Sequence, residues 1–370
     1  MLFVWYDAAM TVGSTFKLLH RHWLTVAFVL GFITDTILLN QIDNLVDNLI
    51  LLFYALLSTT ALLLLYVGVA ERGPGFLTRF FKRFAPVGMQ YAFGGLLSGM
   101  LIFYGRSGDW VASAPFLLII LAVIFGNEFV SKRSDRLVYH IALYFIGVFS
   151  YIVLVVPVIT GKMGDGIFIL SGLIALMIVT FVVQVLFRIV PNFMAVNTQR
   201  VIFTVASIYI GFNALYFTSL IPPIPLSLTQ LEMVQSVETY TAPTGNKIYR
   251  IETEEQPWYR RLPLTRPILH PTGSSIACYA RVYAPTKLET DIYHRWEYKD
   301  VNGDWQEHFR YGYTIAGTNE GGYRGYTRNT SFFSGLWRCS VETKRGQVLG
   351  REVVRIDTTG EPKDIKVTVE

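Results

Sequence analysis

The sequence predicts an α-helical integral membrane bundle of about seven spans, followed by an all-β antiparallel sandwich. Three observations lead to this fold class. The 370-residue chain is 52% hydrophobic and only 16% charged, with a mean hydropathy of +0.39, which is too apolar for one soluble domain of this size. Long apolar stretches fill residues 22–221. From residue 222 the chain becomes polar and aromatic, and from residue 274 its apolar residues alternate with others, as in a half-buried strand.

The apolar stretches have the length that a bilayer demands, because its hydrocarbon core takes about 20 apolar residues per helix. Spans are expected at residues 22–40, 46–68, 85–104, 113–130, 138–158, 166–189 and 201–221. The first is the weakest, since Thr34, Asp35 and Thr36 interrupt it. Gly95 and Gly99 have the GxxxG spacing that lets two helix backbones approach closely, either inside the bundle or in a homo-oligomer.

Basic residues in the short loops predict the orientation, because Lys and Arg gather on the cytoplasmic side. One side has eleven of them, at positions 17, 21, 72, 79, 82, 83, 132, 133, 136, 188 and 200. The other side has two, Arg106 and Lys162. We therefore expect a multi-pass protein of a bacterial inner (plasma) membrane with a cytoplasmic N-terminus. An odd number of spans then makes the C-terminal domain periplasmic.

The C-terminal third divides into a linker, a sandwich and a tail. Prolines at 222, 223 and 225 end the last helix, since proline cannot continue one. Residues 222–270 are predicted to form a linker with a β-hairpin around Thr244–Gly245, residues 271–360 the sandwich, and residues 361–370 a short frayed tail. Within the sandwich, Asn302–Gly303 is a strong two-residue hairpin signal. Short strands at this spacing are typical of an immunoglobulin-like domain.

The two cysteines, Cys278 and Cys339, both fall in the predicted sandwich. Cys278 lies on the apolar face of its strand, and Cys339 alternates with Trp337 and Val341, so both are expected to point into the core. An exported domain allows a disulfide between them, although buried free cysteines are also ordinary core residues. The domain has no spacing typical of a four-ligand zinc site, so no metal and no cofactor are expected.

Five motifs in the C-terminal half carry a resemblance to a known bacterial family. They are PPIPLSL at 222–228, YAPTKL at 283–288, YHRWEY at 293–298, GGYRGYT at 321–327 and GLWRCSVETKRGQVLGR at 335–351. This stretch resembles the domain of unknown function 2914, in the arrangement where it follows a multi-span inner-membrane domain. The resemblance implies an exported β domain and no particular activity.

Four polar residues stand out in the membrane half: Asp35, Gln90, Gln184 and Asn213. A carboxylate in the middle of a span costs roughly 2.5–3.5 kcal/mol on insertion scales, so Asp35 is a candidate proton or cation site. The alternative is a short first span whose Asp35 reaches the outer interface. The three amides can hydrogen-bond between helices, or line a cavity together with Asp35.

Arg79, Lys82 and Arg83 lie among phenylalanines in the segment FLTRFFKRF at 76–84. This pattern suits an interfacial helix held by anionic lipid. The alternative is a positive-inside loop without lipid specificity.

In the sandwich, strand alternation puts Arg324, Tyr326 and Arg328 on one face. Arg and Tyr are common on recognition surfaces, and guanidinium groups suit phosphate or carboxylate ligands. The alternative is a solvated strand face with aromatic cross-strand pairs.

These observations favour a binding or anchoring protein over an enzyme, because the chain has no GxSxG, P-loop, HExxH or CxxC motif. The expected partners are membrane lipids and an envelope protein or anionic envelope ligand, and a net charge of +5 gives no indication of nucleic-acid binding. The second hypothesis is a transporter or lipid-translocating protein with the sandwich as an accessory domain.

Overall fold

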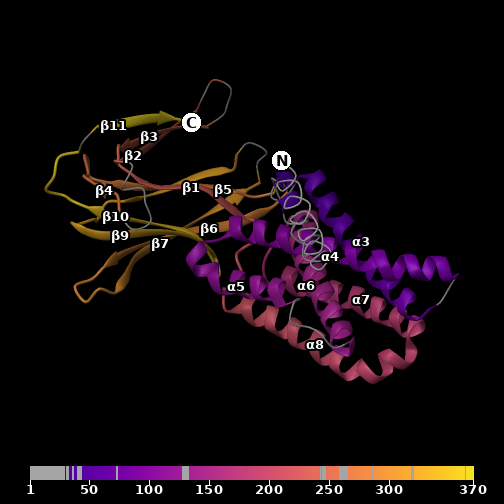
Figure 1. The fold of residues 1–370 in the computed structure, drawn as a ribbon. Helices are drawn as coiled ribbons and strands as arrows, with labels where there is room; N and C mark the ends of the chain where they lie inside the picture. Colours follow the sequence, from indigo (N-terminus) through magenta and orange to yellow (C-terminus); the bar gives the residue numbers. More distant parts are fainter. Residues whose placement is uncertain are drawn as a thin grey trace, which may run out of the picture. The chain divides into compact units, whose positions relative to one another are not determined.

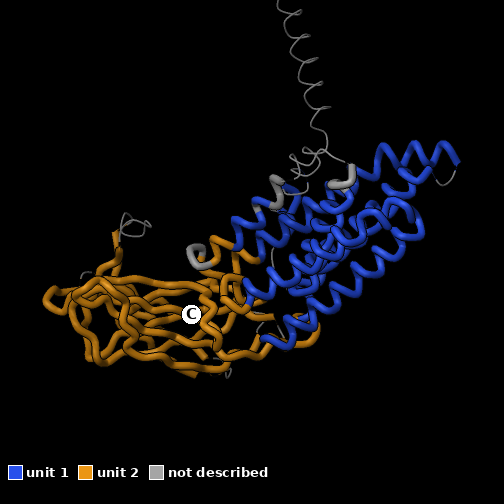
Figure 2. Tube along the Cα trace, turned by 90° about the horizontal axis from the view of Figure 1, so that it is seen from below, with its two compact units in different colours: residues 1–103, 116–156, 164–216 blue, residues 104–115, 157–163, 217–370 orange. Residues whose placement is uncertain are grey.

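A computed structural model describes the chain from residue 44 to 370, apart from 72–73, 127–132, 242, 244–246, 258–265, 286, 318–320 and 363; before residue 44 it describes 30, 33–35 and 37–39. Contacts divide the chain into two compact units, coloured blue and orange in Figure 2. The helical unit takes in the described residues up to 103, together with 116–156 and 164–216. The β unit takes in 104–115, 157–163 and 217–370.

Five described helices are long and apolar enough to cross a membrane (Figure 1). They are α3 (Leu45–Val69), α4 (Gly75–Ser107), the Leu137–Thr160 part of α6 (Arg133–Thr160), α7 (Asp165–Ile189) and α8 (Pro191–Phe217). The multi-pass helical architecture is therefore as predicted.

The predicted number of about seven spans is not reached within the described residues. The span expected at 113–130 begins as α5 (Trp110–Gly126), whose 17 described residues are fewer than the about 20 that a bilayer core requires, and residues 127–132 lie outside the described structure. The span expected at 22–40 lies largely outside the described residues. Residues 76–84 and the span expected at 85–104 form one continuous helix, α4, with Pro86 inside it.

Helices α3 and α4 approach closely because α4 has glycines where α3 has large side chains. The Asn44 side chain caps the start of α3 by accepting from the Val46 amide at 2.9 Å. A Cβ at Gly95 would lie 2.5 Å from the Tyr54 ring, and one at Gly99 would lie 2.6 Å from Leu51. The GxxxG pair therefore serves packing inside this bundle.

The β unit consists of three sheets (Figure 1). Sheet A has the order β1 (Ser227–Val234), β5 (Ile276–Tyr283), β8 (Tyr323–Asn329). Sheet C has the order β4 (Ile268–Leu269), β10 (Val348–Ile356), β9 (Gly335–Thr343), β6 (Glu289–Lys299), β7 (Trp305–Ala316). Sheet B has the order β11 (Ile365–Val369), β3 (Lys247–Glu254), β2 (Ser236–Thr241). All pairs are antiparallel except β10 with β4.

Sheet A lies between the other two sheets. One of its faces packs on sheet C through two fully buried clusters, which include Ala280 with Val341 and Cys278 with Trp296. Its other face packs on sheet B through a cluster that includes Ala277 of β5 and Val237 of β2. Alternation along β5 explains this arrangement, since successive residues point to opposite faces. The immunoglobulin-like topology stays a prediction.

Two of the predicted boundaries need correction. The segment 222–270 is more than a linker with a hairpin, because β1 pairs with β5 along its whole length and belongs to sheet A. The hairpin itself is present as β2 and β3, although Thr244–Gly245 lies outside the described residues. The tail 361–370 contains β11, which pairs with β3 from Ile365 to Val369. The sequences of β1 and β11 give no strong local indication of a strand, because pairing with distant strands stabilises both.

Candidate functional site: an arginine pair that holds Glu370

Strands β5 and β8 bring two arginines together on the face of sheet A that is turned to sheet B. The register pairs Tyr279 with Tyr326 and Arg281 with Arg324. Because Cys278, Ala280 and Val282 of β5 face the core, the alternate residues Tyr279 and Arg281 face the other way. Like charges directly opposite each other destabilise a sheet unless a counter-charge lies between them.

Glu370 supplies that counter-charge. Two backbone hydrogen bonds with Tyr249, of 2.9 and 3.0 Å, continue the β11–β3 pairing to residue 370. The Glu370 carboxylate accepts from Nη2 of Arg281 and, at 3.0 Å, from the hydroxyl of Tyr279. Its Oε2 lies 3.8 Å from Nε of Arg324. We call Tyr279, Arg281, Arg324 and Glu370 the Glu370 cluster.

The cluster is half-buried, which makes its charges matter. The side chains of Arg281, Arg324 and Glu370 are 22%, 31% and 19% exposed. Burial, and then the hydrogen bond to Glu370, raise the pKa of Tyr279 to about 12, so its hydroxyl stays a donor at neutral pH. The Nε atoms of both arginines are buried without a hydrogen-bond partner in the described structure. The cluster therefore contains two guanidinium N–H donors that no acceptor of the described structure satisfies.

The structure places the predicted trio Arg324, Tyr326 and Arg328 on one strand and one face, but not as one open site. Only Arg324 belongs to the Glu370 cluster. Tyr326 accepts from the Thr239 hydroxyl at 3.4 Å and packs against sheet B. Arg328 donates at 2.6 Å to the Val237 carbonyl and lies 5.3 Å from the centroid of the Tyr326 ring. Strand β2 thus occupies much of the predicted surface.

Tyr279, Arg281 and Glu370 were missed as site residues. The alternation along β5 puts Tyr279 and Arg281 on the same face, and this pattern could have identified both as site residues. No local pattern identifies Glu370, because it contacts Arg281 across 89 residues of sequence.

Asp35 is fully buried in the helical unit and accepts hydrogen bonds from Tyr54, at 2.7 Å, and from Ser98. Gln90 is also buried. Gln184 is exposed on α7, and Asn213 donates at 2.8 Å to the Tyr209 carbonyl one turn earlier in α8. Among the described residues, the proposed four-residue polar site is therefore not assembled as a unit. The alternative, in which Asp35 reaches the outer interface, stays a prediction.

The basic residues of α4 differ from one another. Lys82 forms an ion pair with Glu71 at 2.7 Å. Arg79 donates to the Gly75 carbonyl of its own helix at 3.2 Å, and Arg83 lies 5.6 Å from the centroid of the Phe84 ring. Both arginines are exposed.

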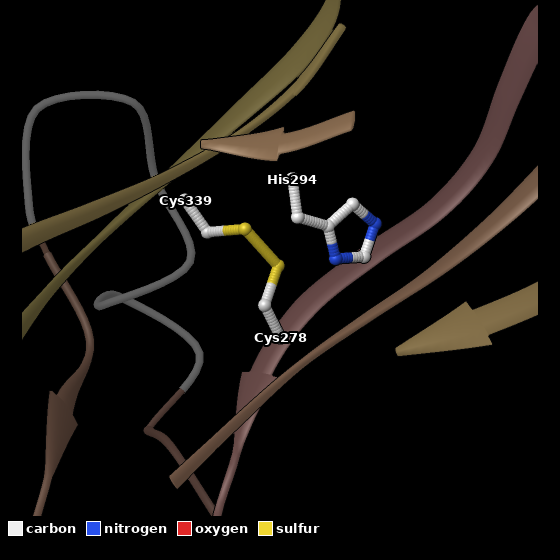
Figure 3. Close-up of side chains that lie close together, drawn as sticks. All are labelled: Cys278, His294 and Cys339. Carbon is white, nitrogen blue, oxygen red and sulfur yellow. A yellow bond between two sulfur atoms is a disulfide. The ribbon is translucent and has the colours of Figure 1, made fainter. Parts of the chain in front are cut away.

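Cys278 of sheet A and Cys339 of sheet C form a disulfide between the two sheets, with the sulfur atoms 2.10 Å apart (Figure 3). The fully buried ring of His294 lies beside it. Burial lowers the pKa of His294 to about 3, so the ring is neutral. Its nitrogens contact Thr327 Oγ1 at 3.0 Å and the Tyr313 hydroxyl at 2.9 Å. With its two sulfurs bonded to each other, this group packs as part of the buried core of the β unit.

Comparison with known families assigns part of the β unit. Residues 289–356 match the family described as "Protein of unknown function (DUF2914)". This confirms the resemblance over β6 to β10, although the motifs had suggested a longer stretch from residue 222. The chain thus carries a C-terminal DUF2914 domain, preceded by five long apolar helices. Arg324 lies inside the matched residues, and Arg281 and Glu370 lie outside them.

No curated protein matches the chain. Among solved structures, the alkylpurine DNA glycosylase AlkC of Pseudomonas fluorescens, bound to DNA containing an abasic site analog, aligns with 86% of this chain and 100% of its own at 9% identity. The TM-score is 0.19, so this likeness carries no argument about fold or function.

Proposed function

We propose that this chain is a membrane-anchored binding protein whose β unit recognises a carboxylate or phosphate group of an envelope partner. The observation that carries the proposal is the Glu370 cluster, in which two guanidinium groups and a tyrosine hydroxyl already hold a carboxylate. Glu370 acts as an internal ligand that an anionic group of the partner displaces. Guanidinium groups bind both carboxylate and phosphate well.

The basic-residue count supports an inner-membrane anchor with the β unit in the periplasm. The absence of the common catalytic motifs from the sequence supports binding over catalysis.

Because Glu370 is proposed to occupy the site in the absence of a partner, removing Glu370 and removing the arginines should change partner binding in opposite directions. The full-length protein is purified from gently solubilised membranes, and the bound proteins and lipids are identified by mass spectrometry. The variants are Glu370→Gln, which removes the internal anion, and Arg281→Gln with Arg324→Gln, which removes the receptor. Arg355→Gln is the matched control, because Arg355 is an exposed strand arginine outside the cluster.

The proposal expects Glu370→Gln to retain more of the anionic partner than the wild type, and the double arginine variant to lose it. Arg355→Gln should behave as the wild type. If the cluster is only a structural ion pair, Glu370→Gln and the double variant will both be less stable and the set of bound molecules will stay the same. That result would refute the proposal.

A second candidate function is proton- or cation-coupled transport, and the complete burial of Asp35 favours it. Buried ionisable residues in membrane helices frequently mark ion pathways. The protein is reconstituted in liposomes that contain a pH-sensitive dye, and proton flux is compared between the wild type and Asp35→Asn. A flux that Asp35→Asn abolishes supports transport, whereas equal leakage from both proteins excludes a proton pathway through Asp35.

A further inference from the structure

Helix α4 is longer than a bilayer requires. Its 33 residues extend about 50 Å at 1.5 Å per residue. The hydrocarbon core, about 30 Å thick, takes about 20 of these residues. The apolar part 85–104 fills that length, so residues 75–84 extend beyond it to the level of the lipid headgroups.

This extension has an exposed aromatic stripe. Phe76, Phe80 and Phe84 are spaced four apart, which places them on one face of the helix. Their exposed fractions are 75%, 47% and 49%. The rings of Phe80 and Phe84 contact each other with centroids 4.7 Å apart. A continuous apolar surface of this kind is stable against acyl chains and unfavourable against water.

Two arginines run beside the stripe. Arg79 follows Phe76 by three positions and Arg83 follows Phe80 by three, so each arginine lies next to a phenylalanine of the stripe. Both are exposed, and within the described residues neither has a carboxylate partner. Lys82 differs, because Glu71 neutralises it at 2.7 Å. The unneutralised charge of this face is therefore that of Arg79 and Arg83.

We infer that Arg79, Arg83 and the Phe76–Phe80–Phe84 stripe form a binding site for a phospholipid with an anionic headgroup. The guanidinium groups bind the headgroup phosphate, and the stripe packs along the acyl chains. Both halves of the ligand are needed, because the arginines lie at headgroup level while the last phenylalanine adjoins the hydrocarbon-spanning part of α4. This site is independent of the Glu370 cluster.

The test is native mass spectrometry of the full-length protein in detergent, titrated with phosphatidylglycerol or with phosphatidylcholine of the same acyl chains. The wild type should retain phosphatidylglycerol more tightly. A basic residue near a membrane surface contributes about fivefold in affinity, so Arg79→Gln with Arg83→Gln should weaken phosphatidylglycerol binding about twenty-five-fold. Binding of phosphatidylcholine should change little.

Two controls keep the result interpretable. Glu71→Gln with Lys82→Gln should bind as the wild type, because this double change removes an ion pair whose net charge is zero. Arg79→Lys with Arg83→Lys keeps the charge and should retain most of the phosphatidylglycerol affinity, which separates loss of charge from misfolding.

Equal affinity of the wild type for the two lipids would overturn the inference. An equal loss in the Glu71→Gln, Lys82→Gln control and in the Arg79→Gln, Arg83→Gln variant would also overturn it. Displacement of the lipid by inorganic phosphate alone would show that the acyl chains do not contribute. A dimer that persists without lipid and dissociates in Phe80→Ser would assign the stripe to a second copy of the chain instead.

Discussion

Arg281 and Arg324 are direct cross-strand neighbours in sheet A, and both face the same carboxylate oxygen, Oε2 of Glu370. A like-charged pair at this register is unfavourable on its own. The edge strand β11 therefore does more than pair with β3. Glu370, the residue that follows it, supplies the negative charge that offsets the repulsion between the two arginines.

Glu370→Gln is expected to destabilise the β unit by about 1–2 kcal/mol. The estimate is below the 3–5 kcal/mol of a fully buried broken pair, because these side chains are partly exposed and water screens the remaining charges. Denaturant unfolding followed by tryptophan fluorescence measures the change, since Trp296 and Trp337 lie in the core of this unit.

The background variant Arg281→Gln provides the control for coupling. If loss of the ion pair causes the destabilisation, Glu370→Gln should lower the unfolding free energy less in the Arg281→Gln background than in the wild type. Equal costs in both backgrounds would mean that Glu370 acts through its backbone pairing with Tyr249.

The Cys278–Cys339 disulfide closes a loop with a sequence separation of 61 residues. In the chain-entropy model, a crosslink of this length stabilises by about 4 kcal/mol. Replacing both cysteines by Ala should therefore lower the unfolding free energy by an amount of this order.

Intact-mass analysis after unfolding and alkylation without reductant checks that the bond forms in the exported protein. An unmodified mass is expected. Two alkylated thiols would show that the cysteines are free core residues.

The spans and most strands could be predicted because their signals are local. Helix α3 lies within one residue of its expected bounds. Asn302–Gly303 lies in the hairpin connection between β6 and β7, with φ of Gly303 at 89°, but this connection runs from Lys299 to Trp305 and is longer than the predicted two-residue turn. Strand β11 could not be predicted, because its five residues owe their conformation to pairing with β3, more than a hundred positions earlier. Helix α5 has the hydropathy of a span, and its described part ends at Gly126, directly before residues that lie outside the described structure.

The candidate site was predicted only in part, because some of its contacts join residues that are distant in the sequence. The face that contains Arg324, Tyr326 and Arg328 follows from alternation, which is local. Sheet B covers this face through contacts such as that of Arg328 with Val237, which is 91 residues away in the sequence. No local sequence pattern predicts such contacts.

Glu352 gives the β unit a pH dependence whose sign can be worked out. Burial, and then the negative charge of Glu232, raise the pKa of Glu352 to about 7, above its ordinary 4.5. The folded state therefore holds this proton more tightly than the unfolded state. Stability should decrease as pH rises from 4.5 to 7, and the full cost remains above pH 7.

Glu352→Gln should remove that cost. The variant is expected to be more stable than the wild type by about 2 kcal/mol at pH 8, after discounting for partial exposure, and equally stable at pH 4. Denaturant unfolding at the two pH values measures the difference. A variant that is less stable at pH 8 would show that the Glu352 carboxylate makes a favourable interaction when ionised.

The orientation can be decided by fusing a reporter that is active only in the periplasm. The eleven-to-two distribution of basic residues predicts signal from a fusion after Glu370 and none from a fusion after Phe84. A fusion after Lys162, between α6 and α7, lies in a loop on the predicted outer side and should also give signal. This third fusion matters because the total number of spans is not fixed by the described helices, so the side of the β unit does not follow from the side of the N-terminal loops.

Signal after Phe84 with none after Lys162 would invert the bundle. Signal after Lys162 but not after Glu370 would mean an odd number of crossings between these two positions and a cytoplasmic β unit, where glutathione would keep Cys278 and Cys339 reduced.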